Sequence, residues 1–385
     1  MIQMKKICFV VNSRANYARI KTTIQASKAN KNFQTFVIVG ASGLLFNYGR
    51  VEDIIEHDGI EIDYRVYSSV SGDFPESMAK TTGLAIIELS TIFAKINPDF
   101  VVSVADRFET LGTVIAASYM NIPVIHTQGG EISGSIDESV RHACTKLSHI
   151  HFPATFSAGK VIEQLGENPE NIFVTGCPSI DIAKSTSDIP VSEVLKKYKG
   201  VGIGIDSSKP YLLISQHPVT TDYKNSRTQA TKTLDAIIKL GVQAIWLWPN
   251  IDSGSDSISK ALREFRENEQ NNQVTFYRNF SAEDYIRVLR SASCILGNSS
   301  SGIRESAYLG VPSVVIGDRQ LGREHSDNVK LTSHDSEQII ETTRTQILHG
   351  RYRSSDLFGD GSAGVKMISI LESLDPKIQK NFFRK

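Results

Sequence analysis

DFVVSVADRFET, residues 99–110, carries the pattern that decides the fold: an apolar run that stops abruptly at charged residues. The run 99–105 is apolar on both faces, which is typical of a strand buried inside a parallel sheet. KICFVV (6–11), FQTFVIVG (33–40) and PVIHTQ (123–128) repeat the pattern, with helix-length segments between them. This alternation predicts an α/β domain built around a parallel sheet.

The first series continues through HIHFPAT (149–155) and IFVTGCP (172–178), and a polar stretch rich in Ser and Lys follows near 184–208. A second series comes after that stretch. Its strands are expected at YLLISQHP (211–218), AIWLWPN (244–250), VTFYRN (274–279), CILGNSS (294–300) and PSVVIGD (312–318).

Two successive α/β series predict two Rossmann-like domains that face each other across a central cleft. We expect the first domain over residues 1–185 and the second, nucleotide-binding domain over residues 186–362. Residues 363–385 are expected to form a helix that packs back on the first domain.

Composition excludes several functional classes. The 385 residues carry 42 basic and 42 acidic side chains, so no global charge favours nucleic acid or an anionic membrane. No apolar run approaches the roughly 20 residues of a membrane span, and the N-terminus has no signal-peptide pattern. The four cysteines form no CxxC pair and are expected to be buried free thiols. We therefore expect a cytoplasmic protein.

Polar residues directly after the predicted strands are the candidate site residues, because ligands of parallel sheets bind at the carboxyl ends of strands. Arg14 follows the first strand, where it is either part of an anion site or a solvated turn residue. Asp106 and Arg107 follow 99–105 as either a structural ion pair or a catalytic base beside a phosphate clamp.

The segment after 123–128 is rich in candidates. Gly129 and Gly130 allow close approach of the backbone to a ligand. Asp137 and Arg141 have the i, i+4 spacing of one helix face, which fits either a ligand site or an exposed salt bridge.

In the second series, GNSSSGIRE (297–305) offers hydroxyl groups and backbone amides to a diphosphate, and Glu305 offers a carboxylate to ribose hydroxyls. The turn after the first strand lacks GxGxxG, which disfavours bound NAD. The chain also lacks the Walker lysine and a GxSxG elbow, which disfavours a P-loop and a serine hydrolase. No His/Cys cluster has the spacing of metal ligands.

These motifs resemble the signature of hydrolysing UDP-N-acetylglucosamine 2-epimerases, the enzymes that start sialic acid synthesis. HTQGGEISGSIDESVRHACTKLSHIH (126–151) carries most of the resemblance, which is closest to the epimerase half of the animal bifunctional epimerase/kinase. Further matches are SRANY (13–17), DRFE (106–109), GCPSID (176–181), QHPVTTD (216–222), PNIDSGS (249–255), GNSSSGIRE (297–305), GDRQLGRE (317–324) and GDG (359–361).

The resemblance implies a glycosyltransferase-B-like fold, a homodimer or homotetramer, and a reaction that uses no cofactor or metal. In that reaction a base removes the sugar C2 proton, UDP leaves by anti elimination, and water adds to the glycal to give N-acetylmannosamine.

The resemblance also assigns roles to residues of this chain. Asp106, Glu131 and Asp137 are implied in proton transfer, with His217 assisting the leaving group. Gln128 and Arg141 are implied in the sugar pocket. The residues implied in binding UDP are Arg14, Arg107, His217, Ser299, Ser300 and Arg319 at the diphosphate, and Asn250, the backbone around Phe280 and Glu305 at the uridine.

The chain departs from the family pattern at Gln128 and Asn16, where many members carry acidic residues. An amide cannot act as a general base, so either Glu131 or Asp137 takes the proton or the substrate lies differently. Alternatives are the same reaction on UDP-N,N′-diacetylbacillosamine, on the route to legionaminic acid, and a catalytically inactive sugar-nucleotide sensor. A non-hydrolysing epimerase and a glycosyltransferase are further alternatives.

Overall fold

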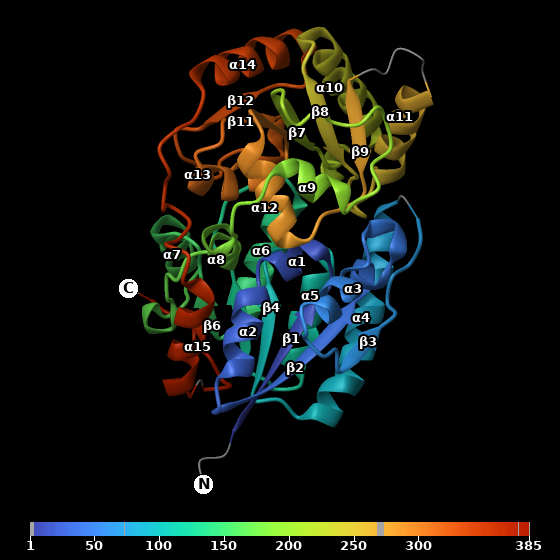
Figure 1. The fold of residues 1–385 in the computed structure, drawn as a ribbon. Helices are drawn as coiled ribbons and strands as arrows, with labels where there is room; N and C mark the ends of the chain where they lie inside the picture. Colours follow the sequence, from blue (N-terminus) through green and yellow to red (C-terminus); the bar gives the residue numbers. More distant parts are fainter. Residues whose placement is uncertain (1–3, 73, 268–272, 376, 385) are drawn as a thin grey trace. The chain divides into compact units, whose positions relative to one another are not determined.

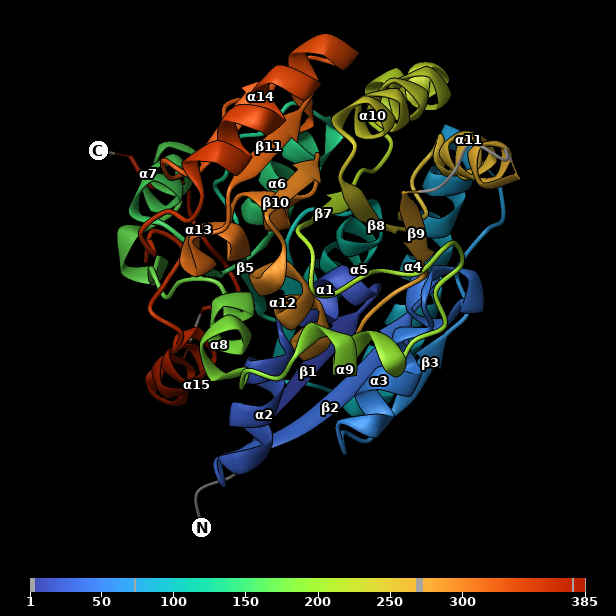
Figure 2. The same ribbon diagram turned by 45° about the horizontal axis from the view of Figure 1, so that its top comes forward.

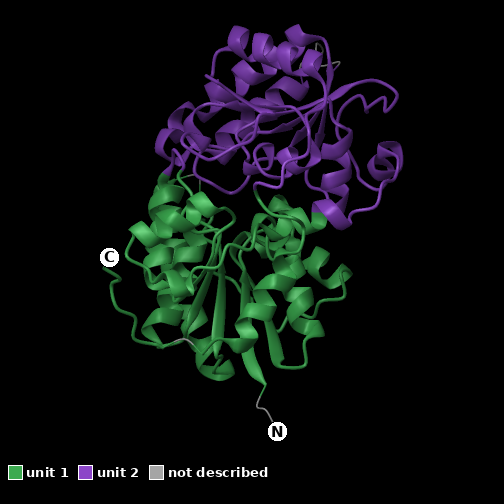
Figure 3. Ribbon diagram, turned by 90° about the vertical axis from the view of Figure 1, so that its left-hand side faces the viewer, with its two compact units in different colours: residues 1–132, 136–182, 358–385 green, residues 133–135, 183–357 purple. Residues whose placement is uncertain are grey.

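The computed structural model describes residues 4–72, 74–267, 273–375 and 377–384. The chain divides into two compact units, and it returns to the first unit after completing the second (Figure 3). The sequence predicts a boundary between the two domains after residue 185 and a return to the first domain after residue 362. The first unit comprises residues 1–132, 136–182 and 358–385, and the second comprises residues 133–135 and 183–357.

A six-stranded parallel sheet forms the centre of the first unit, in the order β3-β2-β1-β4-β5-β6 (Figure 1). The strand order reverses between β1 and β4, as in doubly wound folds, whose ligands bind at that point. The strands are β1 (Lys5–Val11), β2 (Phe33–Gly40), β3 (Tyr64–Val66), β4 (Phe100–Val104), β5 (Val124–Thr127) and β6 (Ile150–Phe152).

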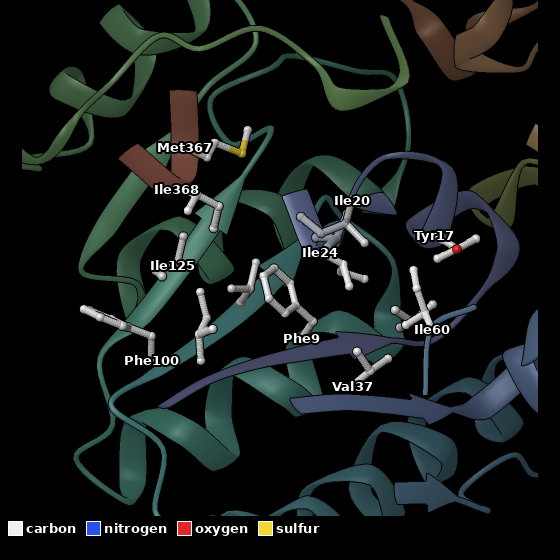
Figure 4. Packing of buried hydrophobic residues seen from close by; sticks show 14 of the residues in the cluster. Phe9, Tyr17, Ile20, Ile24, Val37, Ile60, Phe100, Ile125, Met367 and Ile368 are labelled. Atoms are coloured by element: carbon white, nitrogen blue, oxygen red, sulfur yellow. The ribbon is translucent and has the colours of Figure 1, made fainter. Parts of the chain in front are cut away.

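Helices cover both faces of this sheet. They are α1 (Arg14–Ala18), α2 (Lys21–Ala29), α3 (Val51–His57), α4 (Pro75–Ile96), α5 (Phe108–Tyr119), α6 (Ile136–Leu147), α7 (Phe156–Gln164), α8 (Pro178–Ser185) and α15 (Ala363–Ser373). Alternate residues of β1 belong to two separate cores, because successive strand side chains point to opposite faces. Ile7 and Phe9 pack with residues of α2 and α15. Figure 4 shows Phe9 in this core, together with Ile24 and Met367. Cys8 and Val10 pack with residues of α4 and α5.

The second unit repeats this architecture with the sheet order β12-β11-β10-β7-β8-β9, which reverses between β7 and β10. Both units therefore have the doubly wound strand order that the alternating sequence pattern predicts. The strands are β7 (Tyr211–Ser215), β8 (Gln243–Leu247), β9 (Val274–Tyr277), β10 (Cys294–Gly297), β11 (Ser313–Ile316) and β12 (Val329–Thr332).

The helices of the second unit also form two layers. They are α9 (Val191–Lys196), α10 (Ser226–Leu240), α11 (Ser255–Glu267), α12 (Ala282–Ser291), α13 (Glu305–Leu309) and α14 (Ser336–His349). Leu212 and Ile214 of β7 pack with α10, α11 and α14. Tyr211 and Leu213 face the opposite core, which includes α9 and α12, seen side by side in Figure 2.

Single turns of 3₁₀-helix connect several of these elements. They are η1 (Ala41–Leu44), η2 (Phe46–Tyr48), η3 (Pro169–Asn171), η4 (Thr220–Asn225), η5 (Ser300–Gly302) and η6 (Asp318–Gln320).

Two predicted elements were wrong. The run 172–178 is not a strand: only Ile172 forms an isolated bridge, because the Cys177 amide turns away and donates to the Phe358 carbonyl at 2.7 Å. The helix expected over 363–385 ends at Ser373, where Lys5 Nζ donates to the Leu374 carbonyl at 2.8 Å. Proline at 376 disfavours helical conformation in the residue before it.

No helix within the described ranges has the length and apolar character needed to cross a membrane. The same ranges contain no group of three His, Cys, Asp or Glu side chains that could hold a metal ion. All four cysteines are free and buried, as predicted.

Residues 377–384 lie against the far edge of the first sheet, around the carboxylate of Glu167. Lys380 Nζ donates to Glu167 Oε2 and to the Ser148 carbonyl, both at 2.6 Å. Lys146 Nζ donates to Glu167 Oε1 at 2.5 Å, and His151 Nε2 lies 3.1 Å from Glu167 Oε2. A buried carboxylate is therefore held by three basic side chains.

This arrangement predicts a pH-dependent contribution to stability. Burial raises the pKa of Glu167, but the hydrogen bonds from His151, Lys146 and Lys380 outweigh it and lower the pKa from 4.5 to about 2. The stabilisation is present above pH 4.5 and is lost as the pH falls from there toward 2. Glu167→Gln is expected to lower the free energy of unfolding by about 2–3 kcal/mol at pH 7.

Urea unfolding between pH 7 and pH 3 measures this effect. The exposed neighbour Glu170 provides the matched control, and Glu170→Gln is expected to change the free energy of unfolding by less than about 0.5 kcal/mol. A difference between wild type and Glu167→Gln that stays constant down to pH 3 would contradict the explanation.

Candidate active site

The carboxyl ends of β1 and β4, where the first sheet reverses its order, are joined by Asn16. Its Nδ2 donates to the Val104 carbonyl and its Oδ1 accepts from the Asn12 amide, both at 3.2 Å. The side chain both donates and accepts, which an ionised carboxylate cannot do. Asn16, a departure from the family pattern, is therefore explained here by a buried structural role. Arg14, two residues before Asn16, is the first residue of α1 and is half-buried.

Asp106, at the end of β4, forms a buried ion pair with Arg141 of α6. Asp106 Oδ2 accepts from Arg141 Nε at 3.1 Å and also from Nη2. The third Arg141 donor, Nη1, binds the Glu131 carbonyl. Arg141 is only 1% exposed, so the alternative of an exposed salt bridge with Asp137 is wrong.

Arg141 is also the electrostatic centre of the three predicted proton-transfer residues. Burial lowers the pKa of Arg141, but Asp106, Glu131 and Asp137 outweigh it and raise that pKa above its ordinary value. All three carboxylates thus interact electrostatically with one buried guanidinium. We call Asp106, Glu131, Asp137 and Arg141 the carboxylate cluster.

Arg107 forms a buried ion pair with Glu109. Its Nε and Nη2 donate to the two carboxylate oxygens of Glu109 at 3.1 and 3.2 Å, and both side chains are buried. The role of Arg107 at a diphosphate stays a prediction.

Gln128 directly follows β5 and lies in a sharp, buried turn. Its backbone has φ of 60°, its amide donates to the Phe152 carbonyl at 2.9 Å, and the residue is fully buried. A residue other than glycine with positive φ is strained, and such strain is concentrated at functional sites. Gly130 follows with φ of 79°, and a Cβ there would lie 2.0 Å from the Ala158 carbonyl oxygen.

In the second unit, Asn298 joins the ends of β7 and β10, where the order of that sheet reverses. Asn298 Oδ1 accepts from the His217 amide and Nδ2 donates to the His217 carbonyl, both at 2.8 Å. Sequence analysis did not single out Asn298, although it lies within GNSSSGIRE. The side-chain amide of Asn298 fixes the backbone of His217. The side chain of Asn16 has the same role at the ends of β1 and β4.

The His217 ring has a defined orientation. Its Nδ1 accepts from the Asn250 amide at 3.2 Å, so the proton of the neutral ring is on Nε2. The ring can therefore donate a hydrogen bond or a proton through Nε2. The structure thus brings His217 and Asn250 together.

The segments after β10 and β11 place further polar groups beside Asn298. The Asn298 carbonyl accepts from Arg319 Nη1 at 3.1 Å and from Gln320 Nε2 at 2.8 Å. Ser299 caps η5, and Ser300 is 8% exposed in the same turn. We call His217, Asn298, Ser299, Ser300 and Arg319 the second-unit cluster.

Glu305, at the start of α13, is a buried carboxylate. It is 7% exposed, and its Oε2 has no hydrogen-bond partner among the described residues. A buried polar atom without a partner costs free energy, which a ligand donor would remove. This oxygen is therefore a ligand-binding candidate.

The Phe280 ring is buried in the second unit, so its side chain is not available to a ligand. Its ring is 4% exposed and packs against Tyr198 and Tyr277, with centroid distances of 4.7 and 5.1 Å. The next residue, Ser281, caps α12 through a bond from the Asp284 amide.

Two doubly wound sheets, each with polar residues where its order reverses, define a two-domain α/β protein of the glycosyltransferase-B-like fold. The family model described as UDP-N-acetylglucosamine 2-epimerase matches residues 25–372. The chain belongs to this family and is an enzyme of it.

Individual relatives agree with this assignment. The UDP-N,N′-diacetylbacillosamine 2-epimerase (hydrolyzing) of Legionella pneumophila is 30% identical, with 96% of each chain covered. The UDP-N-acetylglucosamine 2-epimerase of Neisseria meningitidis is 28% identical and covers 93% of this chain and 92% of its own.

Solved structures share the fold. The UDP-GlcNAc 2-epimerase from Methanocaldococcus jannaschii, solved with UDP-GlcNAc and UDP, matches with a TM-score of 0.78 and 17% identity over 95% of this chain and 99% of its own. The Neisseria meningitidis enzyme bound to UDP-GlcNAc matches with a TM-score of 0.77 and 16% identity over the same shares.

Proposed function

We propose that this enzyme is a hydrolysing 2-epimerase that converts UDP-N-acetylglucosamine to N-acetylmannosamine and UDP. The observation that carries the proposal is the carboxylate cluster, in which Asp106 binds the buried Arg141 and Glu131 and Asp137 interact electrostatically with it. Moving a proton at a weakly acidic carbon and then adding water requires several carboxylates in fixed positions. Relatives from Legionella pneumophila and Campylobacter jejuni whose names specify hydrolysis, 30% and 28% identical, support the hydrolysing type.

In the proposed reaction a carboxylate removes the proton from sugar C2. The C1–O bond breaks, its electron pair leaves with the UDP β-phosphate, and a C1=C2 double bond forms. Water then adds its oxygen to C1 and a proton returns to C2 from the opposite face. Free UDP and N-acetylmannosamine result.

The carboxylates have different surroundings, which favours different roles. Asp106 accepts two hydrogen bonds from Arg141, and these bonds fix the position of its carboxylate. We therefore assign Asp106 to stabilising the developing positive charge at C1. Glu131 and Asp137 share the proton transfers, and Gln128 contacts the sugar.

The leaving UDP is assigned to the second-unit cluster. Arg319, Ser299 and Ser300 bind the diphosphate, and the Nε2 proton of His217 assists its departure. Arg14 and Arg107 are further diphosphate ligands in this proposal. Asn250 and the Phe280 backbone bind the uracil, and Glu305 binds the ribose.

An NMR time course with UDP-N-acetylglucosamine in D2O tests the proposal. Free UDP together with N-acetylmannosamine carrying deuterium at C2 is the expected result. UDP-N-acetylmannosamine as the lasting product would instead indicate a non-hydrolysing epimerase. UDP binding without any turnover would favour the sensor.

The Legionella pneumophila relative favours a second candidate, the same reaction on UDP-N,N′-diacetylbacillosamine. Gln128 is compatible with this alternative, because an amide in place of an acid changes which sugar groups it can bind. The two nucleotide sugars are compared by kcat/KM in the same assay. A ratio above about 100 in either direction, about 2.7 kcal/mol, identifies the substrate.

Glu305 provides a direct test of the nucleotide site. Glu305→Gln is expected to weaken UDP binding by about tenfold, because one charge-assisted hydrogen bond to the ribose is lost. The effect should shrink to less than about threefold with a 2′,3′-dideoxy analogue, which lacks the hydroxyls.

Isothermal titration calorimetry with both ligands gives the comparison. Glu337→Gln is the control, since Glu337 is an exposed residue of α14 that pairs with Lys239 on the surface. Equal losses for UDP and the dideoxy analogue would contradict the ribose assignment.

A further inference from the structure

His126 is a fully buried residue of β5 whose two ring nitrogens both have partners. Its Nε2 lies 2.8 Å from the Ala105 carbonyl oxygen, and its Nδ1 lies 3.2 Å from Thr145 Oγ1 of α6. The ring therefore connects three elements of the first unit: the end of β4, β5 and α6. None of these contacts was predicted from the sequence.

The partners define the protonation of the ring. A carbonyl oxygen can only accept, so Nε2 carries the proton, and Nδ1 accepts from the Thr145 hydroxyl. Burial lowers the pKa of His126 to about 4, so the ring is neutral at pH 7. A neutral ring with both nitrogens bonded is suited to holding other groups in place.

The group that His126 holds is strained. Ala105 has φ of 60°, although it is not a glycine, and its amide donates to the Thr127 carbonyl at 3.1 Å. Its carbonyl accepts from His126, so both backbone polar groups of Ala105 are bonded to β5 residues. Strained backbone persists only where its surroundings fix it.

The turn at Ala105 determines where the next side chain points, and that side chain is Asp106. The loop at the end of β5 fits closely over the same ring. A Cβ at Gly129 would lie 2.9 Å from His126 Nδ1 and 2.8 Å from Thr145 Oγ1, so a glycine is needed there.

We propose that His126 is a positioning residue for the epimerase reaction: its Nε2–H holds the Ala105 carbonyl and so fixes Asp106 on Arg141. The proposal rests on the proposed function. His126 does not touch substrate. It acts through the strained turn that carries Asp106.

Two substitutions separate the hydrogen bond from the volume of the ring. His126→Leu fills the space but has no donor, and we expect kcat to fall about 100-fold, the cost of misplacing a reacting group by about 1 Å. His126→Gln keeps a donor at the position of Nε2 and should retain kcat within about tenfold of wild type. UDP affinity, whose proposed ligands lie mainly in the second unit, should change less than about threefold in both.

A second-site substitution distinguishes positioning from a structural role. Glycine adopts positive φ without strain, so Ala105→Gly should restore kcat of His126→Leu by at least about tenfold. A structural loss of folding would lower the melting temperature and would not be repaired at position 105. Equal kcat for wild type and His126→Leu, or no recovery with Ala105→Gly, would overturn the proposal.

If the proposed function is wrong, the wild type turns over neither nucleotide sugar, and this result is distinct from a failure of the His126 proposal. In that case ¹⁵N-histidine NMR tests the geometry without activity. The His126 signal, assigned by its loss in His126→Gln, should show a neutral Nε2–H ring whose proton exchanges slowly. An Nδ1–H or charged ring at pH 7 would overturn the proposal.

Discussion

Replacing Glu131 by glutamine is expected to lower kcat by about 10²–10⁴, the range in which a positioned acid or base contributes. The amide has nearly the same shape as the carboxylate but can neither take nor give the proton. UDP affinity should change less than about threefold, because Glu131 is assigned to proton transfer at the sugar and not to the binding of UDP. Steady-state kinetics and calorimetry measure the two quantities.

Glu138→Gln is the matched control for this experiment. Glu138 lies on α6 directly after Asp137, is partly exposed, and lies 3.8 Å from His142. The same change of acid to amide is expected to leave kcat within about twofold of wild type. Comparable losses in Glu131→Gln and Glu138→Gln would refute the role of Glu131.

Arg141→Met is expected to affect both stability and catalysis. Removing one partner of a buried ion pair costs about 3–5 kcal/mol, because the remaining charge is buried without compensation. Here Asp106 would lose two hydrogen bonds, and the negative charges of Glu131 and Asp137 would no longer be balanced. The free energy of unfolding and kcat should both fall.

Arg141→Lys separates charge from geometry in the same position. Lysine restores a positive charge but cannot donate in the planar fork that reaches Asp106 and the Glu131 carbonyl together. We expect most of the lost stability to return and kcat to stay at least about tenfold below wild type. Full recovery of kcat would show that charge alone is needed. Arg287→Lys, in an ion pair of the second unit, controls for the substitution itself.

The sequence predicted the central strands well because they are buried on both faces. β1, β2 and β4 have the expected positions within one residue at each end. β3 and β12 were not predicted, since they are short strands at the sheet edges and contain charged residues such as Arg65 and Lys330. An edge strand is only partly buried, so it lacks the continuous apolar run.

The site residues were predictable as a set, but their partners were not. Spacing along α6 suggested Asp137 for Arg141, whereas the guanidinium binds Asp106, 35 residues away. Arg107 likewise binds Glu109. Each of these carboxylates can form an ion pair with an arginine. The partner that an arginine binds therefore depends on how the strand ends are arranged in the fold. The turns with positive φ at Ala105 and Gln128 were not predicted, because neither position has the glycine that usually indicates such a turn.

The discontinuity of the first unit also determines the order in which the protein can mature during translation. Met367 and Leu371 of α15 belong to the same core as Phe9 and Ile24. A nascent chain cannot complete that core until α15 leaves the ribosome, after the whole second unit has been synthesised. The second unit can fold first, while the core on that face of the first sheet remains incomplete. We therefore expect chaperone engagement to concentrate on the N-terminal half of the nascent chain.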